Sequence, residues 1–155
     1  MKIKKLLTIF FTIFFSISIV YFVQNSVKSK NSVEKVSQII DGDTIELTNG
    51  QKIRLLGIDA PEKGQYYYKE ASNRLEQLVK GKEVFLEKDV SNRDNYGRLL
   101  RYVYVGGLFV NLEMVKEGYA RALVVAPNLK YSYIFLRAEN EARTKGIGIW
   151  VSVKS

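Results

Sequence analysis

Two tight-turn signals ahead of residue 60 place the strongest constraint on the fold. Asp41-Gly42 separates the apolar segment Val33–Ile40 from Thr44–Leu47, and Asn49-Gly50 separates Thr44–Leu47 from Gln51–Ile58. Asp-Gly and Asn-Gly pairs favour tight hairpins because glycine and asparagine accept positive φ angles at little cost. The pattern therefore predicts three consecutive strands in a meander.

Short elements follow along the rest of the chain. Helical spacing and glycine stops predict helices at Glu70–Val79, Leu112–Glu117 and Tyr131–Lys145. We expect Asn111 to cap the second helix, and Ile134, Leu136, Ala138 and Ala142 to lie on or near the buried side of the third. Further strands are predicted at Val84–Lys88, Arg98–Val105, Leu108–Val110 and Ala120–Val125. This order predicts an α+β, mainly β fold, in which helices pack on a small closed barrel.

Composition narrows the possible chemistry. The 155 residues include no Cys and no His, which excludes disulfides, thiolate metal sites and histidine-based catalysis. Carboxylates, Lys and Tyr remain as acids and bases. The net charge of +8 is compatible with a polyanionic partner and equally with simple solubility.

The N-terminus has the pattern of an export signal. Lys2, Lys4 and Lys5 precede an apolar run, Leu6–Val23, which has no A-x-A-like cleavage site after it. The run suits a cleaved signal peptide or an uncleaved signal-anchor in the membrane, and both alternatives stay open. We expect residues 1–25 to form this segment, 26–34 a linker and 35–155 a domain that is secreted or anchored outside the cytoplasm.

Four acidic residues cluster at predicted strand ends. Asp41 and Asp43 flank Gly42, and Asp59 and Glu62 lie on either side of Pro61. Each alone is usually turn or cap chemistry. Together, two Asp from different strands and a carbonyl near Ala60 would suit a hard cation such as Ca²⁺, with water completing the shell. Glu62 would stay off the metal and take a proton from an attacking water.

Two arginines complete the pattern. Arg54 lies on the predicted strand that ends near Asp59, and Arg98 follows a Tyr-Gly turn. Guanidinium groups match the charge that a phosphodiester transition state develops, although a lone arginine is more often a surface residue. Strand alternation places Arg54 and Asp59 on opposite faces, so the strand must bend between them, most naturally at Gly57.

The chain resembles the staphylococcal nuclease family over roughly residues 35–151. The resemblance rests on several motifs that occur in the same order and at similar spacing. They are Ile40-Asp41-Gly42-Asp43-Thr44, Arg54-Leu55-Leu56-Gly57-Ile58-Asp59-Ala60-Pro61-Glu62, Asp94-Asn95-Tyr96-Gly97-Arg98, Val110-Asn111, Gly118-Tyr119-Ala120 and Gly146-Ile147-Gly148-Ile149-Trp150.

The resemblance implies an OB-fold, a five-stranded β-barrel with three helices, and Ca²⁺-dependent cleavage of DNA and RNA that leaves 3′-phosphate ends. By motif, Asp43, Asp59 and the Ala60 carbonyl would bind Ca²⁺, and Glu62 would be the general base. Arg54 and Arg98 would bind the phosphoryl group, with Arg98 nearer the leaving oxygen, and Tyr96 would lie at the pocket rim. We expect a monomer. The alternative is a non-catalytic OB-fold module that binds single strands, but such modules usually lose some of Asp43, Arg54, Asp59, Glu62 and Arg98.

Two positions depart from the family pattern. Ala60 stands where members often have Thr, with little effect expected because only a carbonyl is needed. Ala122–Pro127 lacks the tyrosines that stack on the substrate's base, so we expect weaker nucleotide binding, which Val124→Tyr would test. Tyr66, Tyr67 and Tyr68 either replace that stacking or pack on the barrel.

Overall fold

The computed structural model describes residues 14–16, 18 and 31–151. It divides into two units, residues 1–32 and 33–155. In the first, 14–16 and 18 are helical, and the rest of the predicted export signal lies outside the described residues. Among the residues that are described, no helix has the length and apolar character needed to cross a membrane.

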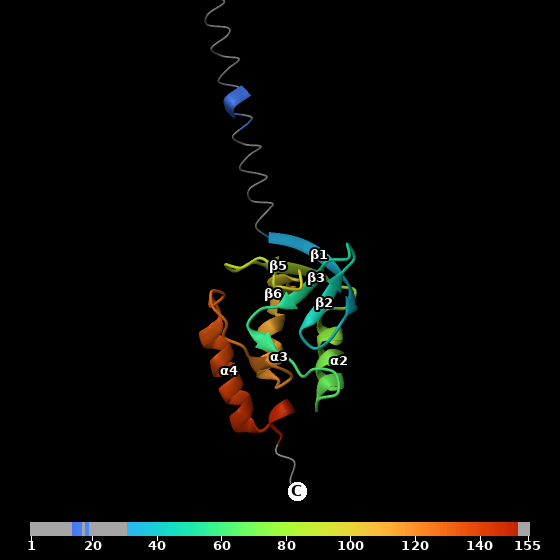
Figure 1. Ribbon diagram of the computed structural model, residues 1–155, viewed down its shortest axis with the longest axis vertical. Coiled ribbons are helices and arrows are strands. Elements are labelled where there is room, and N and C mark those ends of the chain that lie inside the picture. The colour runs from blue at the N-terminus through green and yellow to red at the C-terminus, as the bar shows by residue number, and fades with distance from the viewer. Residues whose placement is uncertain (1–13, 17, 19–30, 152–155) are drawn as a thin grey trace, which may run out of the picture. The chain divides into compact units, whose positions relative to one another are not determined.

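Five strands of the second unit close into a barrel (Figure 1). They pair in the order β3-β2-β1-β5-β6, and a parallel pairing of β3 with β6 completes the ring. The strands are β1 (Asn31–Ile39), β2 (Thr44–Leu47), β3 (Lys52–Leu55), β5 (Glu83–Glu87) and β6 (Leu99–Val105). The predicted α+β OB-fold, with a five-stranded barrel and helices packed on it, is confirmed.

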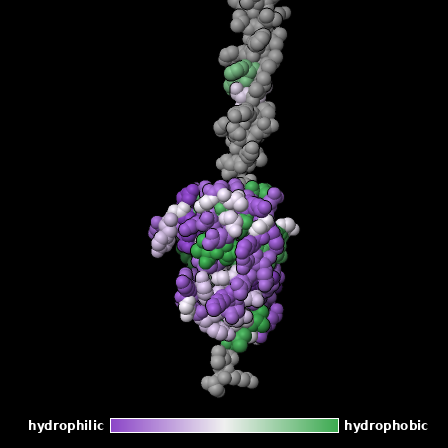
Figure 2. Space-filling view, turned by 90° about the vertical axis from the view of Figure 1, so that its right-hand side faces the viewer, coloured by the Kyte–Doolittle hydropathy of each residue, from purple (hydrophilic) through white to green (hydrophobic). Residues whose placement is uncertain are grey.

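Alternating side chains along the β2–β3 hairpin fill the barrel interior. Ile45, Leu47, Ile53 and Leu55 are each at most 1% exposed, and Ile45 lies directly opposite Ile53 across the β2–β3 pair. Both predicted turns join antiparallel strands here. On the face seen in Figure 2, hydrophilic residues cover most of the domain and hydrophobic ones form small separate areas, as expected where apolar side chains have moved into a core.

Three helices lie together on one side of the barrel (Figure 1). They are α2 (Tyr68–Val79), α3 (Val110–Lys116) and α4 (Ser132–Lys145), and a short 3₁₀ turn, η1 (Gly148–Trp150), follows. The predicted inner face of α4 was wrong in one position. Phe135, Ala138 and Ala142 are buried at helical spacing, whereas Leu136, one residue on from Phe135, is 49% exposed.

Asn111 does not cap α3, contrary to expectation. It lies inside the helix, fully buried, while β7 (Leu108–Phe109) runs directly into the helix and Phe109 holds the cap position. The Asn111 side chain accepts a hydrogen bond from the Val103 amide (2.9 Å) and donates one to the Leu56 carbonyl (2.8 Å). Asn111 therefore ties α3 to β6 and to the segment that follows β3, a long-range role that local pattern does not reveal.

The predicted strand over Gln51–Ile58 is broken near Gly57. It forms β3 and then β4 (Ile58–Asp59), which pairs with β8 (Arg121–Ala122), all that remains of the strand expected over Ala120–Val125. Gly57 has a φ of +76°, and a Cβ atom there would meet the Phe135 ring at 2.3 Å. The bend predicted at Gly57 is confirmed, and packing against α4 requires glycine.

Replacing Gly57 with alanine is expected to destabilise the domain by at least about 3 kcal/mol, because left-handed strain and the clash with Phe135 add. Gly50 is the matched control: its φ is +80°, but a Cβ atom added there would meet nothing within 4 Å. Gly50→Ala should cost only about 1–2 kcal/mol. Urea unfolding of both variants measures the difference, and equal losses would show that packing against Phe135 contributes nothing.

Candidate active site

Asp43 is the buried acid of the site, with 5% of its surface exposed at the start of β2. Its Oδ2 accepts a hydrogen bond from the Ala60 amide (2.9 Å), and its Oδ1 accepts one from the Thr44 hydroxyl (3.0 Å). Burial raises the pKa of the Asp43 carboxyl from 3.8 to about 6, although the Arg54 charge opposes this. Asp41 only turns the chain, because its Oδ1 accepts from the Asp43 amide (3.0 Å).

Arg54 joins the two strand-end acids. Its Nε lies 3.0 Å from Asp43 Oδ1, and its Nη2 lies 3.3 Å from Asp59 Oδ1. Its Nη1 donates to the carbonyls of Leu55 (2.6 Å) and Ile58 (2.7 Å), which flank the bend. The turned backbone thus brings Arg54 and Asp59 together, although simple alternation would separate them.

Arg98 reaches the same cluster from the turn that precedes β6. Its Nε donates to Asp94 Oδ2 (2.7 Å), and its Nη1 donates to the Thr44 hydroxyl (3.3 Å), which itself donates to Asp43. Asp94 Oδ1 accepts from the amides of Tyr96 and Arg98, each at 3.0 Å. Burial alone would raise the pKa of Asp94, but the hydrogen bonds from Arg98 outweigh it and hold that pKa below its usual value.

Sequence reasoning missed the positioning contribution of Asp94 and Thr44. The sequence indicated no role for Asp94 beyond its place at the start of the motif that ends at Arg98, yet its two oxygens hold both the turn and the Arg98 guanidinium. An Asp that precedes an x-x-Gly turn is a usable signal for such anchoring, since Asp side chains commonly bond to amides two residues on. Thr44 gave no signal, because its partner Arg98 is distant in sequence.

Tyr96 and Glu62 lie at the outer edge of the site. Tyr96 is 85% exposed, and the Arg98 Cζ atom lies 5.4 Å from its ring centroid. Glu62 lies in the exposed loop after Pro61, where its amide donates to Gln65 Oε1 (2.8 Å). Within the part of the chain that the structure describes, the Glu62 carboxylate has no hydrogen bond or ion pair. It is therefore available to solvent or substrate.

A first cavity, of about 250 Å³, opens between the two arginines and is here called the arginine cavity. Its walls include Arg54, Gly57, Arg98, Leu123, Val125 and Asn128. Leu123 and Val125 line it, but Val124, which lies between them in the sequence, does not. Val125 is therefore a better position than Val124 for a tyrosine that would test stacking on the base.

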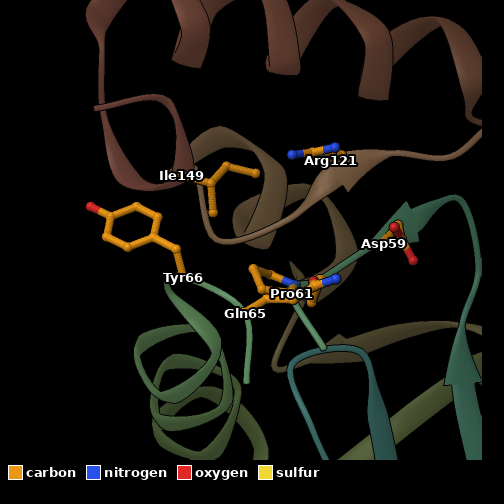
Figure 3. Close-up of a pocket in the computed structure, with 7 residues that line it drawn as sticks. Asp59, Pro61, Gln65, Tyr66, Arg121 and Ile149 are labelled. Carbon is orange, nitrogen blue, oxygen red and sulfur yellow. The ribbon is translucent and has the colours of Figure 1, made fainter. Parts of the chain in front are cut away.

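A second cavity, of similar volume, lies beside Asp59 and is here called the Asp59 cavity (Figure 3). It is lined by Asp59, Ala60, Pro61, Gln65, Tyr66, Arg121 and Ile149. The two alternatives for the tyrosines, stacking on a base or packing on the domain, apply to different residues. Tyr66 is 59% exposed at this cavity, whereas Tyr67 stacks on Tyr119 with ring centroids 5.6 Å apart.

The available oxygen donors suit a hard cation. Asp43 and Asp59 both contact one guanidinium, so their carboxylates share one side of the fold. No hydrogen bond from the described residues reaches the Ala60 carbonyl, which leaves that oxygen available. A cation would stabilise the ionised form of the buried Asp43. The described residues contain no group of three or more acidic side chains placed to hold a metal, so solvent or substrate oxygens would be needed as well.

Comparison with known proteins gives a consistent result. The family model described as staphylococcal nuclease homologue matches residues 52–152. A thermonuclease of Staphylococcus intermedius is 40% identical over 124 residues, which is 74% of each chain. A thermonuclease of Staphylococcus hyicus is 38% identical over 75% of this chain and 74% of its own. Endonuclease YncB of Bacillus subtilis is 42% identical over 79% of this chain and 65% of its own.

Proposed function

The chain belongs to the staphylococcal nuclease family, and on this premise we propose that it is a Ca²⁺-dependent nuclease that hydrolyses DNA and RNA and leaves 3′-phosphate ends. One observation carries the proposal. Arg54 binds both Asp43 and Asp59, and Arg98 reaches the same cluster through Thr44. Two cationic clamps therefore meet two metal-binding acids, the arrangement that phosphodiester cleavage needs.

Asp43, Asp59 and the Ala60 carbonyl would hold the ion, which would supply charge stabilisation to the phosphoryl oxygens when bound. The Asp43 carboxylate is buried, and hydrogen bonds from the Thr44 hydroxyl and the Ala60 amide fix its orientation. The exposed Asp59 is held by Arg54 alone among the described residues. Asp43 is thus the rigid metal ligand, and Asp59 can adjust its position to the substrate.

The two arginines have different shares of the work. A guanidinium has five N–H donors. Arg54 uses three of them in hydrogen bonds to Asp59 and two carbonyls, and its Nε forms an ion pair with Asp43. Arg98 commits only two, to Asp94 and Thr44. Arg98 therefore presents more donors to a phosphoryl group, and we assign it as the main phosphate clamp, with Arg54 chiefly holding the acids in place.

Glu62 is the base that best fits the attack. Its carboxylate is exposed beside Pro61 and unpaired among the described residues, so it can take a proton from water without first breaking an ion pair. Water oxygen then bonds to phosphorus, and the bond from phosphorus to the 5′ oxygen breaks near Arg98. The phosphate stays on the 3′ side, the departing 5′ oxygen takes a proton from solvent water, and Glu62 returns its proton to solvent.

End-labelled single-stranded DNA and RNA oligonucleotides test this proposal directly. With Ca²⁺ and the full chain, we expect internal cleavage of both, and products that shift in mobility after treatment with a 3′-phosphatase. Products with 5′-phosphate ends would contradict the assigned leaving group. Binding without cleavage would instead identify a non-catalytic single-strand module.

We also propose export, on the basis of Lys2, Lys4 and Lys5 ahead of the apolar run Leu6–Val23. The chemistry of an unselective nuclease fits this location, because such an activity endangers the cell's own nucleic acids. Cell fractionation tests the proposal: nuclease activity is expected in the medium or on the outer face of the membrane. Activity confined to the cytoplasm would refute it.

The aliphatic wall of the arginine cavity predicts weak base binding. Val125→Tyr is expected to lower the KM for DNA about tenfold, because stacking on a base contributes about 1–3 kcal/mol. Val124→Tyr is the matched control, since Val124 does not line the cavity. Steady-state kinetics on one oligonucleotide gives both values. If the two variants had the same KM, the cavity would not hold a base.

A further inference from the structure

The Asp59 cavity adjoins the reaction centre through Asp59 and Ala60, but the mechanism above assigns no role to its other lining residues, Tyr66 and Arg121 among them. Asp59 lines this cavity, Arg54 lines the arginine cavity, and the two side chains are ion-paired at 3.3 Å. The proposed phosphate position thus adjoins both cavities. A nucleic acid strand that crosses the centre can place one nucleotide in each of them.

Arg121 supplies an uncommitted cation in the Asp59 cavity. It lies directly opposite Asp59 in the β4–β8 pair, so the two side chains share a face. Nevertheless, the Arg121 side chain forms no ion pair or hydrogen bond with any described residue. Its guanidinium lies 5.5 Å from the Trp150 ring centroid. A cation–π contact uses none of the N–H donors of a guanidinium in a hydrogen bond, so those donors stay available to an anion.

Tyr66 offers an aromatic surface at the same cavity. It is 59% exposed, and Figure 3 places it across the cavity from Arg121, with Pro61 and Ile149 between them. An arginine with available donors, an exposed ring and two apolar side chains match the phosphate, base and sugar of one nucleotide. Tyr67 cannot serve in this way because it packs on Tyr119.

We infer that the Asp59 cavity binds the nucleotide on the 5′ side of the scissile bond, with Tyr66 stacked on its base and Arg121 bound to its 5′-phosphate. This rests on the proposed function, which sets the strand direction. Arg98, assigned to the leaving 5′ oxygen, lines the arginine cavity, so that cavity takes the 3′-side nucleoside. The 5′-side nucleotide is left to the opposite cavity.

Three thymidine dinucleotides separate the two sides: TpT, pTpT with an added 5′-phosphate, and TpTp with an added 3′-phosphate. With the full chain and Ca²⁺, we expect kcat/KM for pTpT to exceed that for TpT about tenfold, a ratio that corresponds to one charge-assisted contact. Arg121→Ala should reduce this pTpT:TpT ratio to about one, mainly through KM, and should leave the TpTp:TpT ratio as it is in the native chain.

Arg137→Ala is the charge-matched control, because Arg137 is an exposed arginine on α4 whose ion pair is with Glu141. It should keep the native pTpT:TpT ratio. Tyr66→Ala, at an exposed position, tests the second contact without disturbing Trp150, and should raise the KM for both TpT and pTpT several-fold. A native pTpT:TpT ratio in Arg121→Ala would overturn the inference, as would a loss of both ratios together. Failure of the native chain to cleave any of the three would instead count against the proposed function.

Discussion

Replacing Arg98 with lysine is expected to lower kcat on DNA about 10³-fold. Three donors of Arg98 make no hydrogen bond with the described residues, and it is fixed by Asp94 and Thr44 before substrate arrives. Lysine keeps the charge but loses the planar fork, and removal of one preorganised donor alone typically costs 10²–10³ in rate. The KM should change far less, because the donors act chiefly on charge that develops in the transition state.

Arg101→Lys, on the strand β6 that follows Arg98, is the matched control for Arg98→Lys. Arg101 donates to Asn92 and to the Leu100 carbonyl, and it does not line the arginine cavity. Its replacement should lower the melting temperature and leave kcat close to the native value. Steady-state kinetics and thermal unfolding on both variants complete the comparison. A kcat for Arg98→Lys within tenfold of the native value would remove Arg98 as the main phosphate clamp.

Glu62→Gln is expected to lower kcat about 10²–10⁴-fold, the range typical for loss of a general base. The substitution keeps the shape of the side chain and removes only its capacity to accept a proton. Because Glu62 is exposed and its carboxylate is unpaired among the described residues, stability should change by no more than about 0.5 kcal/mol. Thermal unfolding and single-turnover cleavage separate the two effects.

Glu70→Gln serves as the control for this second variant, since Glu70 is an exposed acid in the first turn of α2. It should retain native kcat and stability. A Glu62→Gln enzyme with native kcat would exclude Glu62 from the proton transfer. The metal-binding acids and the arginines would then have to act on water without it.

Local pattern was sufficient for the β2–β3 hairpin and for the bend at Gly57. The β2–β3 hairpin follows from turn residues and alternation alone, both of which are encoded within a few neighbouring positions. The need for Arg54 and Asp59 to meet made glycine the natural hinge, and its positive φ agrees. Such inferences succeed because backbone geometry limits where a strand can turn.

Long-range contacts account for what the sequence did not reveal. Asn111 resembled a helix cap, but its partners are Val103 and Leu56, which only the assembled barrel brings near. The pairing of Arg121 with Asp59 joins segments far apart in the chain, so no motif could place Arg121 at the site. Likewise, the choice between Val124 and Val125 depends on which side of a loop faces the arginines.

The most direct test of metal-assisted cleavage is the rate at which the full chain cuts a single-stranded DNA oligonucleotide in Ca²⁺, in excess EGTA, and after Ca²⁺ is restored. We predict a loss of at least about 100-fold in EGTA, since the ion would supply several kcal/mol of transition-state stabilisation, and full recovery on restoring Ca²⁺. Cleavage that continues at its original rate in EGTA would contradict the account, because Asp43 and Asp59 would then act without a metal ion.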